Sequence, residues 1–289
     1  MIASFMLRHS KIYESCTSLG LDTLYLRLAS LQEHRILSEG EKKPSILEYP
    51  EGFRMKLDYK DTYDFTYLLE WKGSNGSYEI KTSSYLKKIL KRGDSFIDGG
   101  AHAGYFSMLA SKLTGSGGKV YAFEPDPVPF KKLKKNIQIN RLHNIRPYEV
   151  GIGDADRVAN FNLSDRDSSG NSFLSLNGLS NTAIKVKLFR LDTLFPNGIK
   201  NLKAMKLDLE GYENEAIIGA RNLIRKSKPT IIFEFNYRIL FEKDRRYNQV
   251  FDSLRDLGYS KFIESETGNS VGKYSDLSHL YTNVIAVGR

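Results

Sequence analysis

Cysteine and long apolar runs are nearly absent from this chain of 289 residues, and each absence excludes a class of protein. The lone cysteine, Cys16, cannot form an intrachain disulfide and has no partner motif nearby, so it is interpreted as a packing residue rather than a nucleophile. No apolar run approaches the ~18 residues that a membrane-spanning helix needs, and the opening residues become polar too soon for a secretory signal. We therefore expect a soluble, cytoplasmic protein without a transmembrane segment; peripheral membrane contact stays open.

Acidic residues are fewer than basic ones: 34 Asp and Glu stand against 43 Lys and Arg, which gives a formal net charge of +9. Such a balance suits an acidic partner such as nucleic acid, an anionic lipid surface or a phosphorylated substrate. The charges are dispersed, however, and no basic run is interleaved with aromatic residues, so a nucleic-acid partner ranks below a small-molecule substrate. The densest cluster falls in an expected amphipathic helix, where a solvated face is the simpler interpretation; it comprises Lys131, Lys132, Lys134 and Lys135.

The pattern of elements divides the chain near residue 92. Residues 1–92 are expected to form a small N-terminal α+β extension that provides substrate or oligomer contacts. Residues 93–289 alternate strand with helix, which predicts a largely parallel sheet covered on both faces, with ligands bound beyond the carboxyl ends of its strands. The elements expected in the extension are helical segments within 12–37 and at 84–90, strands at 53–57 and 64–71, and a turn at 73–76.

The main domain, 93–289, is also expected to carry a β-hairpin insertion. Its strands are 157–163 and 183–190, and a stretch rich in Gly, Ser and Asn, 165–181, connects them. Within that stretch, Ser169 to Ser172 is either a substrate-facing lid or an ordinary loop. The other elements expected here are strands at 95–98, 119–123, 145–150, 202–209, 230–235, 261–264 and 283–287, and helices at 105–113, 127–140, 214–226 and 247–257.

The sharpest signal is the segment FIDGGAHAGYF, residues 96–106. A hydrophobic strand ends at Asp98, and Gly99 and Gly100 then allow a tight turn and close backbone approach to a ligand. The helix that opens near Tyr105 presents free backbone N–H groups to a carboxylate or phosphate. A glycine turn between strand and helix predicts a nucleotide-binding site, but such a turn alone is weak evidence.

The segment VYAFEPDP adds an acidic residue at a spacing that suits a ribose. Gly104, which lets the helix pack near the strand, precedes Glu124 by 20 residues. A carboxylate ~20 residues past a glycine turn can accept hydrogen bonds from both ribose hydroxyls, in NAD and in S-adenosylmethionine alike. His102, inside the turn, is expected to contact the cofactor rather than to act in catalysis.

Asp98 favours S-adenosylmethionine over NAD. The dinucleotide fingerprint is G-x-G-x-x-G, whereas Gly100 and Gly104 are four residues apart here, with Asp98 just before them. A carboxylate repels a pyrophosphate but attracts a cofactor that carries an ammonium group and a sulfonium. The alternative is that Asp98 only caps the turn by accepting backbone N–H bonds.

Further acidic residues follow three later strands. In GIGDAD, Asp154 or Asp156 either accepts a hydrogen bond from an adenine amino group or belongs to a surface turn. In KLDLEGYENEA, Asp208 and Glu210 alternate along one face of a strand end, and IIFEFN puts Glu234 on the adjacent strand. Such a cluster could deprotonate a hydroxyl, orient it or hold a divalent metal, although no metal is assigned; the alternative is a set of helix caps with a Lys206 salt bridge.

These segments, in order, resemble the FkbM family of methyltransferases. The resemblance rests on FIDGGAHAGYFS, AFEPDP, GIGDADR, LDTL, KLDLEGYENEAIIGA and IIFEFN, and covers about residues 95–236. It implies a class I, Rossmann-like methyltransferase fold with a seven-stranded, mostly parallel sheet, and transfer of a methyl group to oxygen. The family often has asparagine where His102 stands. The residues expected to bind S-adenosylmethionine are Asp98, Gly99, Gly100, His102, Gly104, Tyr105, Glu124, Pro125 and Asp154, and those expected to be catalytic are Asp208, Glu210 and Glu234.

The function expected from residues and resemblance together is O-methylation of a hydroxyl on a sugar, glycolipid or polyketide-like molecule. Three alternatives remain open: an NAD-dependent sugar-modifying enzyme, a nucleotide- or carbohydrate-binding module that has lost catalysis, and an RNA methyltransferase. The acidic cluster argues against an inactive module, and the lack of a basic, aromatic-rich run argues against RNA.

Overall fold

The computed structural model of the chain describes residues 46–57, 67, 76–162, 173–175, 183–242 and 245–288. Four sequence predictions therefore lie outside the described residues, wholly or for the most part: the helical segment within 12–37 with Cys16, the strand at 64–71, the turn at 73–76, and the connection 165–181 with Ser169 to Ser172. Among the described helices, none has both the length and the apolar character that crossing a membrane would require.

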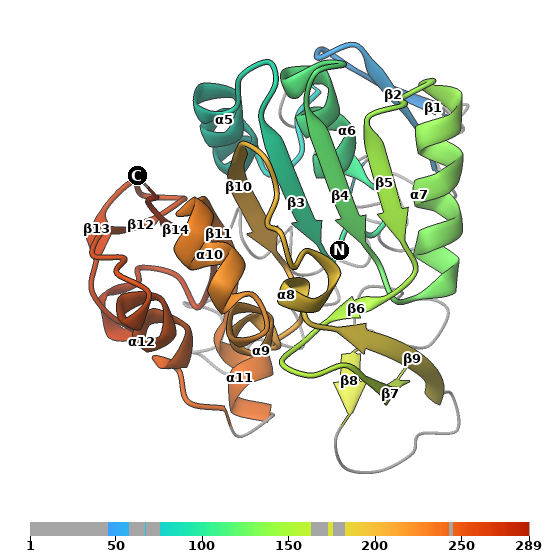
Figure 1. Cartoon of the computed structure of the whole chain (residues 1–289). Helices are drawn as coiled ribbons and strands as arrows, with labels where there is room; N and C mark the ends of the chain where they lie inside the picture. The colour runs from blue at the N-terminus through green and yellow to red at the C-terminus, as the bar shows by residue number, and fades with distance from the viewer. Residues whose placement is uncertain are drawn as a thin grey trace, which may run out of the picture.

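One mixed sheet of eight strands forms the centre of the molecule (Figure 1). Five strands run parallel, and β14 pairs antiparallel with both of its neighbours, β11 and β12. This arrangement confirms the predicted α/β class, with one short strand, β13, added at an edge to the seven expected. From edge to edge the strands are β13 (Ser270–Val271), β12 (Phe262–Glu264), β14 (Tyr281–Ala286), β11 (Thr230–Asn236), β10 (Leu202–Leu207), β3 (Ser95–Gly99), β4 (Lys119–Phe123) and β5 (Ile145–Tyr148).

Both faces of this sheet are buried. Alternate residues of each strand point to opposite sides, so each strand contributes side chains to two hydrophobic clusters. On β3, Phe96 packs into one hydrophobic cluster and Ile97 into the other, and Ala204 and Met205 on β10 divide in the same way. The first cluster includes side chains of α5 (Ile80–Ile89), α6 (Tyr105–Thr114) and α7 (Pro127–Ile139). The second includes side chains of α8 (Leu191–Leu194), α9 (Glu213–Ile218), α10 (Arg221–Ser227), α11 (Tyr237–Glu242) and α12 (Gln249–Asp256).

A second sheet holds the predicted hairpin insertion. Its four strands, in the order β6 (Gly151–Ile152), β9 (Ala183–Phe189), β7 (Arg157–Asn162) and β8 (Phe173–Ser175), extend beyond the carboxyl ends of the central strands (Figure 1). Strands β7 and β9 pair antiparallel as expected, while β6 and β8 were not predicted. The insertion therefore lies beside the edge of the main sheet where ligands of such folds bind.

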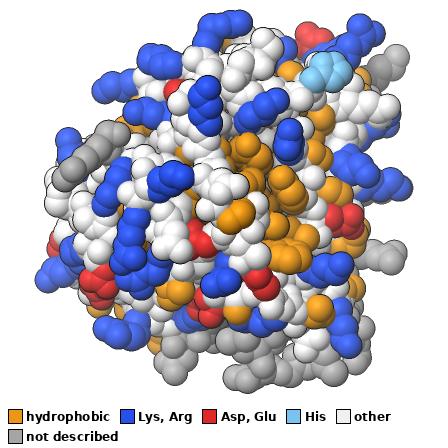
Figure 2. All heavy atoms as spheres, viewed as in Figure 1, with side chains coloured by type: hydrophobic (Ala, Val, Ile, Leu, Met, Phe, Trp, Pro, Cys, Tyr) orange, Lys and Arg blue, Asp and Glu red, His pale blue; other side chains and the backbone are white. Residues whose placement is uncertain are grey.

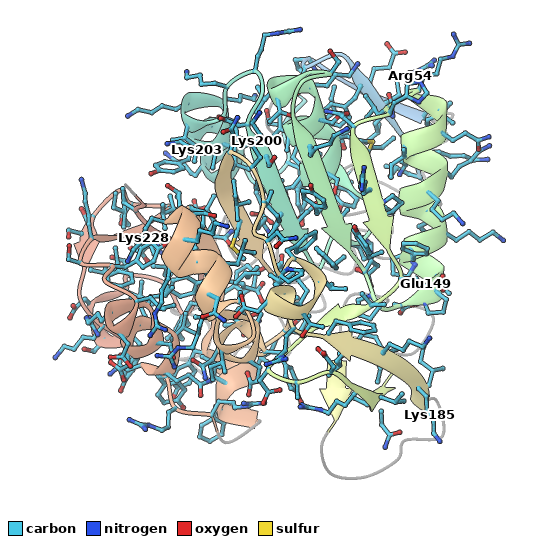
Figure 3. The ribbon with its side chains drawn as sticks, viewed as in Figure 1. Arg54, Glu149, Lys185, Lys200, Lys203 and Lys228 are labelled. Carbon is cyan, nitrogen blue, oxygen red and sulfur yellow. The ribbon has the colours of Figure 1, made fainter. Side chains whose placement is uncertain are left out.

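Part of the N-terminal extension packs into the main core. The hairpin of β1 (Ile46–Tyr49) and β2 (Phe53–Lys56) is tied to α7, since the Arg54 N–H donates to Asn140 Oδ1 at 2.7 Å and the Lys56 N–H donates to Asn136 Oδ1 at 2.8 Å. Figure 3 shows Arg54 beside the end of that helix. The division at residue 92 remains a prediction, but the described residues before it share a core with those after it.

One element differs clearly from its prediction. The helix expected at 214–226 is two helices, α9 and α10, because the chain breaks at Gly219. A Cβ on Gly219 would collide with the carbonyl oxygen of Gly153, so only glycine allows this close approach to the start of the insertion. The strand expected at 202–209 also ends early, at Leu207, which frees the residues after it to form a turn.

The surface fits the interpretation of the charges as solvated. Figure 2 shows Lys and Arg side chains distributed over much of the visible face, interspersed with Asp and Glu. Dispersed positive charge of this kind favours solubility more than the binding of a polyanion.

Candidate active site

A pocket of about 1040 Å³, including the part open to solvent, lies at the carboxyl edge of the central sheet. Its walls come from the turn after β3, the residues after β4, the turn after β10 and the end of β11. Residues of the extension and the insertion complete it, among them Tyr78, Glu79 and Phe161. Pockets at this edge are typical of doubly wound α/β sheets, because several strands deliver their carboxyl-terminal residues to one place.

The glycine turn is bonded to the adjacent strand. The N–H groups of Gly100 and Ala101 both donate to the Phe123 carbonyl oxygen, at 3.0 and 2.9 Å. Gly100 has φ +77°, and a Cβ there would collide with the carbonyl oxygen of Asp208. Glycine at this position therefore lets the turn after β3 pass directly against the turn after β10.

Glu124 fixes the other side of the same turn. Its Oε2 accepts a hydrogen bond from the His102 N–H at 2.8 Å, and its Oε1 accepts one from the Asp126 N–H at 2.9 Å. The Glu124 side chain is buried, and burial raises its pKa to about 8 even though both hydrogen bonds act to lower it. A buried carboxylate at a pocket wall, with oxygen lone pairs left over, can accept further bonds from ligand hydroxyls.

Asp98 lies one layer deeper than Glu124. Its carboxylate accepts a hydrogen bond from the Ser107 hydroxyl at 2.5 Å, and burial raises its pKa to about 6. The charge of Asp98 contributes to the raised pKa of Glu124, so the two acids are close enough to repel. Asp98 does not line the pocket and instead joins β3 to α6.

The acidic residues predicted to be catalytic meet at another part of the pocket wall, called the acidic end below. One carboxylate oxygen from each of Asp208, Glu210 and Glu234 lies within 4.8 Å of the others. Asp208 and Glu210 follow β10, and Glu210 adopts a left-handed backbone, with φ 54°. Glu234 is buried, and burial, followed by the charges of Asp208 and Glu210, raises its pKa well above the ordinary value.

Lys206 is the basic side chain that pairs with this cluster. Its Nζ donates to Asp208 Oδ2 at 2.7 Å and lies 3.8 Å from Glu79 Oε1. Burial alone would lower the pKa of Lys206, but the charges of Asp208 and Glu79 outweigh it, so the pKa is raised. The salt bridge considered from the sequence is thus present, and it coexists with the carboxylate cluster instead of replacing it.

Two neighbours of the cluster were not found by sequence reasoning. Glu79 precedes α5 in a left-handed conformation, and its Oε2 accepts a hydrogen bond from Asn283 Nδ2 at 2.8 Å. Tyr281, on the antiparallel strand β14, lines the pocket with Glu234 and acts to lower the pKa of its carboxyl group. No local motif marks either residue, because each reaches the site through long-range pairing.

The pocket brings together most, but not all, of the predicted site residues. It is lined by Gly100, His102, Tyr105, Glu124, Pro125, Asp208, Glu210 and Glu234. Four other predicted cofactor residues, Asp98, Gly99, Gly104 and Asp154, do not line it. A Cβ on Gly104 would collide with Leu133 of α7, so this glycine allows close approach to that helix, whereas the sequence predicted packing near the strand. Asp154 pairs with Arg157 at 2.8 Å, and Asp156 accepts a bond from the Arg190 N–H at 2.7 Å.

Comparison with known proteins gives three findings. The family model of the methyltransferase FkbM domain matches residues 98–261. The chain is 20% identical over 211 residues to the hexuronic acid methyltransferase AglP of Haloferax volcanii. The aligned region covers 73% of this chain and 82% of that protein. The crystal structure of a methyltransferase FkbM from Methylobacillus flagellatus is 14% identical, with a TM-score of 0.45, and the match covers 81% of this chain and 56% of that one.

Shorter matches involve other methyltransferases. Over 91 residues the chain is 34% identical to a "probable cobalt-precorrin-6B C(15)-methyltransferase (decarboxylating)" of Sulfolobus acidocaldarius, covering 32% of this chain and 46% of the relative. Over 60 residues it is 33% identical to a ribosomal protein L11 methyltransferase of Anoxybacillus flavithermus, covering 21% of this chain and 19% of the relative. These two matches span less than half of each relative.

Proposed function

The chain belongs to the FkbM family of S-adenosylmethionine-dependent methyltransferases, and from this premise we propose that it methylates a hydroxyl oxygen of a sugar, glycolipid or polyketide-like small molecule. The proposal rests on one observation: Glu124 and a separate cluster of three acidic residues line the same pocket. Glu124 lies beside the glycine turn, and the cluster of Asp208, Glu210 and Glu234 lines the same pocket. One end suits a nucleoside, and the other suits an acceptor hydroxyl.

The glycine-turn end has the chemistry that the cofactor needs. The ribose hydroxyls of S-adenosylmethionine would donate to Glu124, whose carboxyl oxygens are already oriented by two backbone N–H groups. Gly100 has no side chain, so the cofactor could approach the backbone closely there. His102, Tyr105 and Pro125 line the adjoining part of the pocket. Direct contacts from Asp98, Gly99, Gly104 and Asp154 remain predictions from the sequence, because none of these residues lines the pocket.

The acidic end would orient the acceptor and take up its proton. S-adenosylmethionine supplies an electrophilic methyl carbon, to which the acceptor oxygen bonds as the bond between sulfur and methyl breaks. The carboxylates of Asp208, Glu210 and Glu234 would hold the hydroxyl by hydrogen bonds and accept its proton as its oxygen becomes methylated. Lys206 holds the Asp208 carboxylate at 2.7 Å and so restricts where the hydroxyl can bind.

A sugar is the acceptor class that the pocket wall supports best. Aromatic rings of Tyr67, Tyr78 and Phe161 line the pocket together with the carboxylates. A sugar ring has apolar faces and hydroxyl edges, so a wall that combines rings with carboxylates can recognise both. The hexuronic acid methyltransferase of Haloferax volcanii, 20% identical to this chain, points in the same direction.

A cofactor-binding experiment distinguishes this proposal from the NAD-dependent alternative. S-adenosylmethionine, but not NAD, should raise the melting temperature, because a ligand that binds only the folded state stabilises it. Glu124→Ala should abolish this shift while the circular dichroism spectrum stays unchanged. A shift with NAD alone would contradict the proposal.

Methyl transfer itself tests the acceptor assignment and excludes an inactive binding module. Labelled methyl groups should pass to sugar-containing acceptors, and Asp208→Asn should lower turnover more than it lowers cofactor affinity. Transfer to RNA that weakens with added salt, without transfer to any small molecule, would instead favour the nucleic-acid alternative.

A further inference from the structure

We propose that Asp208, Glu210 and Glu234 form a binding site for one divalent cation of the Mg²⁺, Mn²⁺ or Ca²⁺ type, and that this cation holds the acceptor hydroxyl beside the methyl donor. The location of the cation follows from the described residues alone. Its role in catalysis rests on the proposed function.

The register of two adjacent strands creates the cluster. Leu207 at the end of β10 pairs with Phe233 on β11, so the next residues, Asp208 and Glu234, leave the sheet at the same edge. Glu210 follows after a turn, and one carboxylate oxygen from each of the three residues lies within 4.8 Å of the others. Oxygens that bind one Ca²⁺ at about 2.3–2.6 Å can lie up to about 5 Å apart, so this spacing already suits a shared cation.

Glu234 provides a separate indication of a ligand. Its side chain is buried at the pocket wall, and its Oε2 atom has no hydrogen-bond partner among the described residues. A buried polar atom without a partner costs about 1–3 kcal/mol, which is why such atoms are rare unless a ligand completes them. A cation between Glu234 and the two other carboxylates would give this oxygen its partner.

The local charge also favours a positive ligand. Among the described residues that line this end of the pocket, the carboxyl groups of Asp208, Glu210, Glu234 and Glu79 face one ammonium group, that of Lys206. Lys206 Nζ bonds to Asp208 Oδ2, which leaves Oδ1 of the same carboxylate for another ligand. A divalent cation would offset most of the remaining charge and allow all three cluster carboxylates to be ionised together.

The donor atoms select the kind of metal. Within the part of the chain that the structure describes, the cluster consists only of carboxylates, without the histidine or cysteine that Zn²⁺ sites use. Hard, oxygen-binding cations take six or more ligands, so three carboxylates leave positions for water and for the acceptor. A hydroxyl bound there is held in place and loses its proton more readily, and the second oxygen of a cluster carboxylate can still receive that proton. The methyl transfer is otherwise as proposed above.

Mn²⁺ binding by the full chain tests the site without relying on activity. Protein freed of metal with EDTA is titrated with Mn²⁺, and free Mn²⁺ is measured by electron paramagnetic resonance. We expect one Mn²⁺ per chain, and about tenfold or weaker affinity in Glu234→Gln and in Glu210→Gln. Asp252→Asn is the matched control, since Asp252 is an exposed acid on α12 that pairs only with Arg255 among the ion pairs described. Binding of S-adenosylhomocysteine, measured by calorimetry, should stay within about twofold of the wild-type value in both cluster variants, which shows that they are folded.

The outcomes separate the cation from the methyltransferase assignment. Absence of saturable Mn²⁺ binding, or equal binding by wild type and both cluster variants, would overturn the proposed site. Full methyl transfer in EDTA would remove the cation from catalysis and leave the proposed function intact. Mn²⁺ binding that depends on the cluster, in a protein that transfers no methyl group to any acceptor, would support the site and reject the proposed function.

Discussion

The two ends of the pocket are held by different kinds of interaction. At the glycine-turn end, Glu124 accepts backbone N–H bonds from His102 and Asp126, within 22 residues of sequence. At the acidic end, Lys206 pairs with Asp208 and with Glu79, which lies in a different part of the chain. The difference indicates that the glycine-turn end is held mainly within one strand-turn-helix region, whereas the acidic end also depends on contacts between distant segments.

The largest expected effect comes from removing the ammonium group of Lys206 at the acidic end. Lys206→Met keeps the length of a side chain that is 3% exposed but removes the ammonium group that pairs with Asp208 and Glu79. Breaking a buried ion pair in this way should lower the free energy of unfolding by about 3–5 kcal/mol, measured by urea denaturation. Added Mn²⁺ should recover part of this loss if the cluster binds a cation.

A second lysine of the same strand is the control. Lys203, labelled on β10 in Figure 3, is only partly buried, and Lys203→Met should change stability by less than about 0.5 kcal/mol. Equal stability of Lys206→Met and wild type would mean that the acids around Lys206 are protonated in the folded protein, and the contrast between the two ends would disappear.

The next effect concerns the contact between the two ends. Gly100→Ala introduces a Cβ that collides with the Asp208 carbonyl oxygen, at a position with φ +77°. We expect a loss of about 2–4 kcal/mol in the free energy of unfolding, together with weaker cofactor binding. Gly52→Ala is the matched control, because Gly52 has φ +80° but no neighbouring atom within 4 Å, so it isolates the cost of the backbone conformation, about 1 kcal/mol. Similar losses in both variants would show that the collision relaxes without cost.

The same contrast explains how much of the site could be predicted. The glycine turn and Glu124 were found because strand, turn and helix signals follow one another along the sequence. Asp208 and Glu234 could be paired because the carboxyl ends of parallel strands meet at one edge, although the register was not known. Most strand and helix positions were found for a similar reason, since both faces of the sheet are buried and the apolar runs are distinct.

What could not be predicted depends on contacts between distant segments. Glu79 has a left-handed backbone without being glycine, and Tyr281 reaches the site only through the antiparallel pairing of β14 with β11. The division of one expected helix at Gly219 follows from its contact with Gly153, which no periodicity reveals. Asp98 was singled out from the sequence, but its burial and its bond to Ser107 behind the pocket wall follow from packing.

A smaller effect should appear as a pH dependence at the glycine-turn end. Burial raises the pKa of Glu124 from 4.5 to about 8, so between these values the folded state binds a proton that the unfolded state does not. The free energy of unfolding of the wild type should therefore fall as pH rises from about 4.5 to 8. Glu124→Gln cannot ionise, so its stability relative to wild type should rise by on the order of 2 kcal/mol between pH 6 and pH 8.

The quantity to compare is the change with pH in the stability difference between Glu124→Gln and wild type. A hydrogen bond lost in the variant would lower its stability by the same amount at every pH and would not alter this change. Urea denaturation at pH 5, 6, 7 and 8 measures it, with Glu266→Gln, at an exposed position, as the control. Parallel pH profiles for wild type and Glu124→Gln would show that Glu124 is ionised throughout this range and that the N–H bonds outweigh burial.

The smallest effect is expected at Asp154, where the sequence and the pocket geometry differ most. Asp154 and Arg157 form a pair whose side chains are 37% and 35% exposed, so Asp154→Asn should change stability by less than about 0.5 kcal/mol. Because Asp154 does not line the pocket, its replacement should weaken cofactor binding by less than about threefold, against more than about tenfold for Glu124→Gln. Calorimetry with S-adenosylhomocysteine measures both variants. A tenfold loss in Asp154→Asn with unchanged stability would mean that the adenine reaches beyond the described wall to this carboxylate, and the cofactor end would then extend into the insertion instead of ending at the glycine turn.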